Sequence, residues 1–211
     1  TIEENRSIAR GVQEMRLSGD VSGITAPGQF VNIRIPEFFL RRPISVCDRD
    51  VENGHLTLVY KMVGEGTKAL SAYRSGQKLD LLTGLGNGYD LAPAGKSPLL
   101  IGGGVGVPPL FLLCRELIAA GASPTVILGF NTKEERFYEE NFRELGAEVI
   151  LTTADGSAGM KGFVTDAIAR LTEGRPSEKG VPYTYFYTCG PEMMLRAVCD
   201  STETDGQCSF E

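Results

Sequence analysis

The sequence has no tryptophan, a single histidine and five cysteines among its 211 residues. No two cysteines have C-x-x-C spacing, and one histidine adds few ligands, so we expect no metal site. His55 follows Gly54, where we expect an exposed hairpin turn. With one candidate base, hydrolysis by a histidine-activated serine or cysteine is also disfavoured. If the protein is an enzyme, its difficult chemistry therefore belongs to a cofactor.

Long hydrophobic runs and an excess of positive charge are absent as well. The longest largely apolar stretch, Val105–Cys114, contains two prolines and is too short to span a bilayer. No basic region followed by an apolar one opens the chain, and the odd cysteine count is typical of thiols in a reducing compartment, so we expect a cytoplasmic protein without membrane contact. A net charge of −6 disfavours nucleic acid as a partner.

Apolar and polar residues alternate in the first part of the chain, residues 1–92. Val31, Ile33 and Ile35 are separated by polar residues, and residues 55–62 show the same period of two. This period is typical of half-buried strands. Turn signals at 18–20, 27–28 and 53–54 divide the pattern into short strands. Together they predict a small antiparallel β-barrel.

From residue 97 the pattern changes to short, nearly continuous apolar runs, each followed by a helix-like segment. The runs occupy 99–101, 125–128, 148–151 and 185–187. We expect one helix over 108–120 and a second that starts at Thr132 and buries Tyr138, Phe142 and Leu145. Alternation of this kind predicts an α/β domain with a doubly wound parallel sheet over 97–205, after a linker at 92–96.

The sharpest motif is the glycine-rich stretch Gly102–Pro109, which follows a buried strand and ends in two prolines. Glycines let a backbone approach a pyrophosphate, and the N-terminus of a helix attracts it. The stretch departs from G-x-G-x-x-G, because Val107 or Pro109 takes the last glycine position. No acidic residue ends the next strand, at 129–131. A tight turn without a ligand is the alternative interpretation.

Two short motifs in the first part of the chain offer further phosphate contacts. Leu40–Ser45 contains a pair of arginines and a hydroxyl, and Gly64–Thr67 stands at the start of a helical segment. A guanidinium and unpaired backbone N–H groups are both suited to phosphate. The alternatives are a solvated arginine pair and an ordinary capped turn.

A fourth motif, Tyr187–Met194, runs from a strand into a proline-initiated helix. It lies at the carboxyl edge of the predicted sheet, where open α/β sheets bind ligands. Cys189 within it is suited to contact a nicotinamide ring. A buried, inert cysteine is the alternative.

In this order, the motifs resemble those of the ferredoxin–NADP reductase superfamily, in which a flavin-binding barrel precedes a nicotinamide-binding domain. Within it, the chain is most similar to electron-transfer subunits of dihydroorotate dehydrogenase. The resemblance covers nearly the whole chain and rests on Pro27–Val31, Leu40–Ser45, Gly64–Thr67, Leu85–Tyr89, Gly102–Pro109 and Cys189–Glu192.

The resemblance implies a set of residues that bind FAD. Arg42 is expected on the phosphates and Ser45 near the flavin N5, where it would be catalytic. Ile44 stands where the wider superfamily has an aromatic residue, so ring stacking from that position is lost. The full implied set is Arg42, Pro43, Ile44, Ser45, Val59, Tyr60, Lys61, Gly66 and Thr67. In this set Tyr60 lines the flavin through its hydroxyl, and Gly66 and Thr67 hold the pyrophosphate.

For NAD(H), the resemblance implies two segments that frame the dinucleotide. Cys189 is expected to be the second catalytic residue. Asn131 and Lys133 leave the choice between NADH and NADPH open, and only the resemblance favours NADH. The implied residues are Gly103, Gly104, Val105, Gly106, Val107, Cys189, Gly190, Pro191 and Glu192.

The implied activity is electron transfer in pyrimidine biosynthesis. Electrons pass from the FMN of a dihydroorotate dehydrogenase catalytic subunit, through a [2Fe–2S] cluster and FAD, to NAD⁺, in a heterotetramer. None of the five cysteines has the spacing of a plant-type cluster, so its ligands are not in this chain. Residues 206–211 are expected to begin the segment that carries them.

Two other functions remain open from the sequence. One is the flavin subunit of a sulfide dehydrogenase or of an NADH-dependent ferredoxin–NADP oxidoreductase, which shares most of these motifs. The other is a non-catalytic regulatory module that keeps the fold but has lost its nucleotides.

Overall fold

The computed structural model describes residues 1–173 and 182–210, which form two compact units divided between Tyr89 and Asp90. The division falls slightly before the predicted one. Residues expected to be a linker form the short 3₁₀ helix η1 (Ala92–Ala94), in which Ala94 is buried. The hydroxyl of Thr184 donates to the Ala94 carbonyl, so this stretch is a packed part of the second unit.

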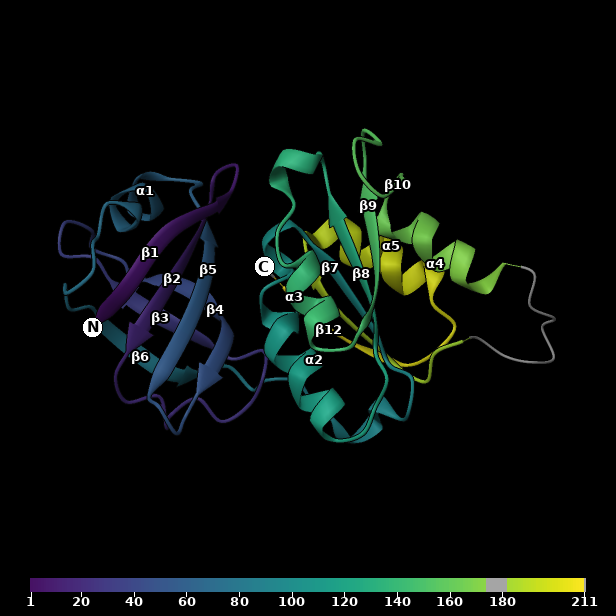
Figure 1. Cartoon of the computed structure of the whole chain (residues 1–211), viewed down its shortest axis with the longest axis horizontal. Helices are drawn as coiled ribbons and strands as arrows, with labels where there is room; N and C mark the ends of the chain where they lie inside the picture. Colours follow the sequence, from purple (N-terminus) through teal and green to yellow (C-terminus); the bar gives the residue numbers. More distant parts are fainter. Residues whose placement is uncertain (174–181, 211) are drawn as a thin grey trace. The chain divides into compact units, whose positions relative to one another are not determined.

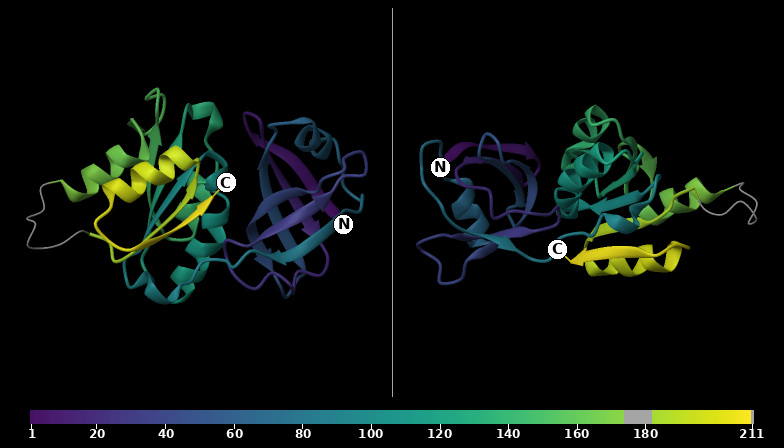
Figure 2. Two further views of the ribbon diagram at one scale, coloured as in Figure 1. Left: turned by 180° about the vertical axis from the view of Figure 1, so that it is seen from behind. Right: turned by 90° about the horizontal axis from the view of Figure 1, so that it is seen from below.

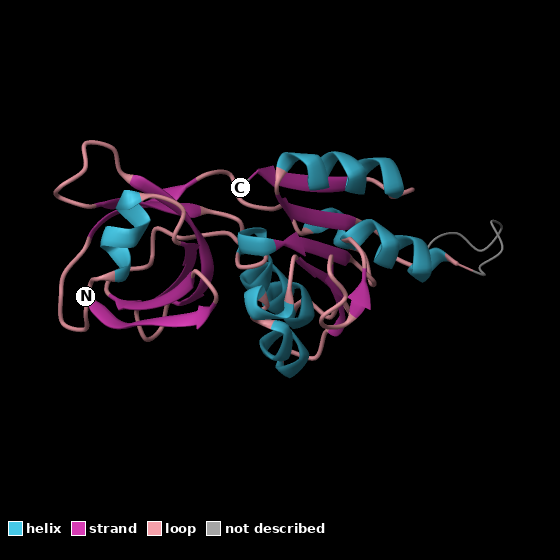
Figure 3. Ribbon diagram, turned by 90° about the horizontal axis from the view of Figure 1, so that it is seen from above, coloured by secondary structure: helices cyan, strands magenta, loops and turns pink. Residues whose placement is uncertain are grey.

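The described strands of the first unit form one antiparallel sheet in the order β1-β2-β5-β4-β3-β6 (Figure 1). Figure 3 shows these strands curving around a shared interior. Val31 and Ile33 point into it while Arg34 is exposed, as the period of two predicts. The elements are β1 (Ile2–Ala9), β2 (Val12–Ser18), β3 (Phe30–Arg34), β4 (Arg42–Asp50), β5 (His55–Lys61), α1 (Glu65–Ser71) and β6 (Asp80–Leu85).

A hydrogen-bond network attaches α1 to the sheet. Tyr60 on β5 donates its hydroxyl to Oδ1 of Asn5 on β1, at 3.0 Å. The Asn5 amide nitrogen then donates to the carbonyls of Leu70 and Tyr73 at the end of α1, both at 3.1 Å. Because α1 has only seven residues, its position depends on such tertiary contacts rather than on helix propensity.

The described strands of the second unit form a parallel sheet in the order β10-β9-β8-β7-β11-β12. Figures 1 and 2 show α2 and α3 on one face and α4 and α5 on the other. Covering on both faces explains the continuous apolar runs. The elements are β7 (Leu99–Gly103), η2 (Gly104–Gly106), α2 (Pro109–Ala119), β8 (Thr125–Phe130), η3 (Lys133–Glu135), α3 (Glu139–Glu144), β9 (Glu148–Thr153), β10 (Met160–Lys161), α4 (Val164–Thr172), β11 (Phe186–Gly190), α5 (Glu192–Ser201) and β12 (Gly206–Phe210).

The predicted helix from Thr132 is wrong in its start. The single turn η3 is followed by Tyr138 with a positive φ of 65°, and α3 begins only at Glu139. Aromatic packing explains the break: the ring of Phe137 lies 5.2 Å from that of Phe130, and Tyr138 lies 5.1 Å from Phe111. Of the three residues expected to be buried, only Phe142 is fully buried.

Residues 206–210, which were expected to follow the α/β domain, belong to its sheet. They form β12, which pairs in parallel with β11 from Phe186↔Gly206 to Gly190↔Phe210. These residues are therefore the edge strand of the second sheet. No helix among the described residues is long and apolar enough to cross a membrane.

The strand order creates a switch point between β7 and β11. From β7 the chain proceeds to β8, β9 and β10 on one side, then returns to β11 and β12 on the other. The connections that leave β7 and β11 therefore diverge at the carboxyl edge of the sheet. Ligands of doubly wound sheets bind at such switch points.

The network at α1 yields a stability prediction. Asn5→Ala should lower the free energy of unfolding by about 1–3 kcal/mol, because two carbonyls and a buried hydroxyl lose their partner. Tyr60→Phe removes one hydrogen bond only and should cost about 0.5–1.5 kcal/mol. Urea titration of both variants measures the difference. An equal cost for the two would show that Asn5 does not attach α1.

Candidate functional site

Arg42 and α1 form the candidate phosphate site of the first unit. Arg42 is the first residue of β4, and its guanidinium lies directly against Gly66 in the first turn of α1. A Cβ on Gly66 would lie 2.8 Å from Cζ of Arg42 and closer still to Nε. Any larger residue at this position would therefore displace the guanidinium from α1. The structure thus brings together two segments that the sequence assigned to FAD, 42–45 and 66–67.

The two neighbouring arginines have different surroundings. Arg41 forms a bidentate ion pair with Asp80, at 2.9 and 3.1 Å, and its hydrogen bonds lower the pKa of that carboxyl. Arg42 donates to the Leu40 carbonyl at 2.6 Å, and its Cζ lies 5.0 Å from the ring centroid of Phe38. None of the described carboxylates forms an ion pair with Arg42. Its positive charge is therefore available to an anion.

The remaining residues of this candidate site lie on β4, β5 and α1. Pro43 is exposed, Ile44 and Ser45 are half-buried, and Ser45 pairs with Phe30. Val59 is buried and Lys61 half-buried on β5, which is the neighbour of β4 in the sheet. The Ser45 hydroxyl makes no hydrogen bond within the described residues, which leaves it available to a ligand.

Two other hydroxyls expected to contact FAD are engaged within the unit. Tyr60 donates to Asn5, and burial raises the pKa of Tyr60 to about 12, so its hydroxyl stays protonated. The Thr67 hydroxyl accepts the N–H groups of Val63 and Gly64, at 3.0 and 3.2 Å, and donates to the Gly64 carbonyl. Tyr60 and Thr67 therefore hold α1 in position, and the close contact between Arg42 and Gly66 depends on both.

In the second unit, the glycine-rich loop passes the end of β11 at the switch point. A Cβ on Gly106 would lie 2.6 Å from the backbone nitrogen of Gly190 and closer still to the Cys189 carbonyl. A Cβ on Gly103 would collide with the sulfur of Met194 from α5. The two predicted NAD(H)-binding segments, 103–107 and 189–192, thus lie side by side.

Gly104 differs from its neighbours in the loop. It has a positive φ of 55°, yet a Cβ there would meet no atom within 4 Å. Gly106 is required by the backbone that it approaches and Gly103 packs against the Met194 side chain, whereas Gly104 borders open space. A backbone that a ligand can approach closely has this property.

Cys189 matches the alternative interpretation of its motif, that of a buried cysteine. It pairs with Gly102 across β7 and is only 2% exposed. A thiol so buried presents almost no surface to a nicotinamide ring, so its expected catalytic contact is not favoured. Pro191 and Glu192 follow it and are exposed, and Glu192 accepts a hydrogen bond from Arg196 at 2.6 Å.

Glu135 is a candidate residue that the sequence analysis missed. It comes from η3, and its Oε2 accepts a hydrogen bond from the amide of Asn131, at 2.9 Å, just beyond β8. Dinucleotide-binding folds place a carboxylate near this position to bind the ribose hydroxyls. The sequence signal was an acidic residue a few positions after the second strand rather than directly at its end.

The described residues contain no group of three or more histidine, cysteine or acidic side chains that could hold a metal ion. His55 is the first residue of β5 rather than a turn residue. Its Nε2 lies 3.3 Å from a carboxylate oxygen of Glu3.

Comparisons with known proteins support the folds of both units. Residues 100–200 match the family model described as "Oxidoreductase NAD-binding domain". A solved NADH-dependent reduced ferredoxin–NADP oxidoreductase is 33% identical, with a TM-score of 0.83 over 96% of this chain and 71% of its own. Phthalate dioxygenase reductase, 21% identical with a TM-score of 0.74, covers 99% of this chain and 66% of its own and supports the fold. The predicted barrel followed by an α/β domain is confirmed.

Among curated proteins, the dihydroorotate dehydrogenase B (NAD(+)) electron transfer subunit of Fusobacterium nucleatum subsp. nucleatum is 42% identical over 100% of this chain and 82% of its own length. The protein of the same name from Geobacillus sp. is 43% identical over 94% of this chain and 76% of its own. With this identity along the whole length, the chain belongs to the family of electron transfer subunits of dihydroorotate dehydrogenase B.

Proposed function

We propose that the chain binds FAD in its first unit and NAD(H) in its second, and transfers electrons between NAD(H) and a dihydroorotate-oxidising catalytic subunit. The observation that carries the proposal is the guanidinium of Arg42, which lies against Gly66 without a carboxylate partner. Membership of a family of electron transfer subunits supports the electron-transfer role and the choice of dihydroorotate as the substrate of the partner.

The residues of the first unit fit a flavin dinucleotide. Arg42 offers a permanent planar cation to phosphate, and Gly66 leaves the space beside it. Ser45 offers a hydroxyl to a flavin ring nitrogen, and Ile44 and Val59 offer apolar surface near it. FAD, when bound, supplies the chemistry that exchanges a hydride with the nicotinamide. The protein contributes binding and orientation.

The residues of the second unit fit a dinucleotide pyrophosphate. Because Pro108 and Pro109 carry no N–H, and the Val107 N–H bonds the Gly104 carbonyl at 3.2 Å, the donors come from residues 104–106. Cys189 and Gly190 contribute the backbone that supports this loop. Pro191 and Glu192 border the ligand at the start of α5.

Glu135 supports NADH rather than NADPH as the dinucleotide. A carboxylate beyond β8 accepts hydrogen bonds from ribose hydroxyls, whereas it repels the 2′-phosphate of NADPH. The sequence motifs alone leave the choice between NADH and NADPH open.

The family name implies a catalytic partner subunit. We further propose that this partner contains FMN, that the assembly is a heterotetramer, and that it acts in the cytoplasm. The five cysteines do not have the spacing of [2Fe–2S] ligands, so no step is assigned to a cluster in these residues.

The second candidate function is an NADH-dependent ferredoxin–NADP oxidoreductase subunit, favoured by the structural similarity to one such enzyme. Reconstitution with a dihydroorotate dehydrogenase catalytic subunit separates the two. Dihydroorotate-dependent formation of NADH supports the proposal. A yellow, flavin-containing protein that reduces ferredoxin but never couples to dihydroorotate would favour the second candidate, and a colourless one would favour the regulatory module.

Arg42→Ala should weaken FAD binding about 10- to 150-fold, because charge-assisted hydrogen bonds of this kind contribute about 1.5–3 kcal/mol. Arg41→Ala is the matched control, since it removes the same charge from a residue already paired with Asp80. Flavin titration of the apoproteins measures both affinities. Equal weakening in the two variants would contradict the assignment of the phosphate contact to Arg42.

Gly104→Ala should slow the reduction of bound FAD by NADH while leaving FAD bound, because its Cβ would enter the space of the pyrophosphate. Gly121→Ala is the control: Gly121 also has a positive φ, of 84°, and open surroundings, but lies after α2. Both substitutions carry a similar strain of about 1–2 kcal/mol. Stopped-flow measurement of flavin bleaching should separate them. Identical rates would make the loop purely structural.

Glu135→Gln should raise the ratio of kcat/KM for NADPH to that for NADH by about tenfold, equivalent to about 1.4 kcal/mol. Glu134→Gln, the exposed neighbour in the same short helix, should leave the ratio unchanged. Diaphorase assays with both dinucleotides measure it. A ratio that does not change in Glu135→Gln would exclude contact with the ribose.

A further inference from the structure

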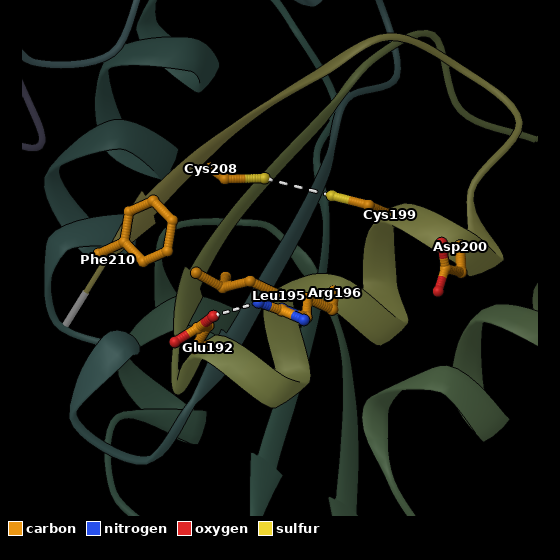
Figure 4. Close-up of a pocket in the computed structure, with 7 residues that line it drawn as sticks. All are labelled: Glu192, Leu195, Arg196, Cys199, Asp200, Cys208 and Phe210. Atoms are coloured by element: carbon orange, nitrogen blue, oxygen red, sulfur yellow. Dashed lines mark hydrogen bonds and ion pairs between the residues drawn. The ribbon is translucent and has the colours of Figure 1, made fainter.

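Two cysteines near the end of the second unit lie in contact. The sulfur of Cys199, on α5, is 3.5 Å from the sulfur of Cys208, on β12 (Figure 4). Both residues are exposed, whereas Cys47, Cys114 and Cys189 are buried. Solvent can therefore reach Cys199 and Cys208 but not the three buried cysteines.

The packing of α5 against the sheet brings the two thiols together. Leu195 and Val198 are buried and fix the orientation of the helix, so Cys199 faces β12. Side chains alternate along a strand, and Gln207 is directed to the backbone of Asp90, with hydrogen bonds of 2.9 Å in both directions. Cys208 therefore points to the opposite face, toward α5. Both positions are set by the core and not by the cysteines themselves.

The pair forms part of the wall of a cavity. Its volume is about 530 Å³, and its lining combines the two thiols with Leu195, the exposed ring of Phe210 and the ion pair between Arg196 and Glu192 (Figure 4). Asp200 completes the lining, and the guanidinium of Arg196 is already paired with Glu192. The cavity gives a small disulfide access to both sulfurs.

We propose that Cys199 and Cys208 form a redox-active dithiol that a low-molecular-weight disulfide, such as oxidised glutathione, converts into an intramolecular disulfide between α5 and β12. The proposal does not depend on the proposed function, because neither thiol belongs to the FAD or NAD(H) residues.

The two thiols have different roles in the exchange. Partial burial and the hydrogen bond with Cys199 raise the pKa of Cys208 to about 11, so Cys208 keeps its proton at neutral pH. Thiolates are the attacking species in thiol–disulfide exchange. The first attack is therefore assigned to Cys199, and Cys208 is assigned the role of resolving thiol.

The reaction balances in two steps. Cys199 first loses its proton to solvent, its thiolate attacks one sulfur of the small disulfide, whose S–S bond breaks, and the small thiolate that leaves takes up a proton from solvent. Cys208 then attacks the Cys199 sulfur of the mixed disulfide, and the second small thiol leaves with the proton of Cys208. Two protein thiols are oxidised, and one disulfide is reduced to two thiols.

The test uses the full chain incubated with oxidised glutathione, followed by thiol titration after denaturation and by peptide mass spectrometry. Two of the five thiols should disappear. The peptides that contain Cys199 and Cys208 should be linked, without bound glutathione. Five remaining thiols, or glutathione on both cysteines of the same molecule, would overturn the proposal.

Single serine variants test the order of the steps, and because both side chains are exposed the variants should fold. Cys208→Ser should accumulate glutathione on Cys199, at least about tenfold faster than Cys199→Ser accumulates it on Cys208. The double variant should lose no thiol, which shows that Cys114, whose pKa burial raises to about 12, does not react. Equal rates in the two single variants would contradict the assigned roles.

Discussion

The second unit depends on the close approach of Gly106 to the end of β11. No side chain fits between this residue and the backbone of Cys189 and Gly190. The approach lets the loop after β7 close over the switch point, and Met194 fills the space beside Gly103. Because these contacts are backbone against backbone, the loop has little freedom to collapse. Gly104, with its open surroundings, is then the position where the loop can meet a dinucleotide.

In the first unit, the equivalent constraint is electrostatic. The two adjacent arginines have different neighbours. Asp80 forms an ion pair with Arg41, whereas Arg42 lies against Gly66 and Phe38, neither of which carries a charge. A partly exposed cation without a carboxylate partner is available to a phosphate. The network of Tyr60, Asn5 and α1 contributes by keeping Gly66 in place. The residues around Arg42 therefore form the setting of a phosphate site.

The sequence predicted the family and the two-part fold correctly because both have strong local signals. The period of two reflects a sheet buried on one face, and the continuous apolar runs reflect a sheet buried on both faces. Predictions that needed more than local pattern were less accurate. The helix expected at Thr132 starts later because Phe137 packs against the nearby Phe130, and Tyr138 packs against Phe111 of α2, which is distant in sequence. Hydroxyls assigned to FAD at Tyr60 and Thr67 are engaged by Asn5 and by Gly64, which no motif reveals.

By itself, the sequence indicated the two kinds of sheet, several of their strands, and the glycines that follow the first strand of the second unit; it placed the arginine pair at the end of a barrel strand, whereas Arg42 is the first residue of β4. These properties follow from periodicity and from the conformational freedom of glycine, which act over a few residues. Only the tertiary structure decided which arginine lacks a carboxylate partner, that Glu135 reaches Asn131, and that Cys199 meets Cys208. The physical reason is that each of these contacts joins residues of different elements, and the packing of those elements places them rather than any local pattern: β6, which carries Asp80, lies beside β3, and α5 packs so that Cys199 meets β12.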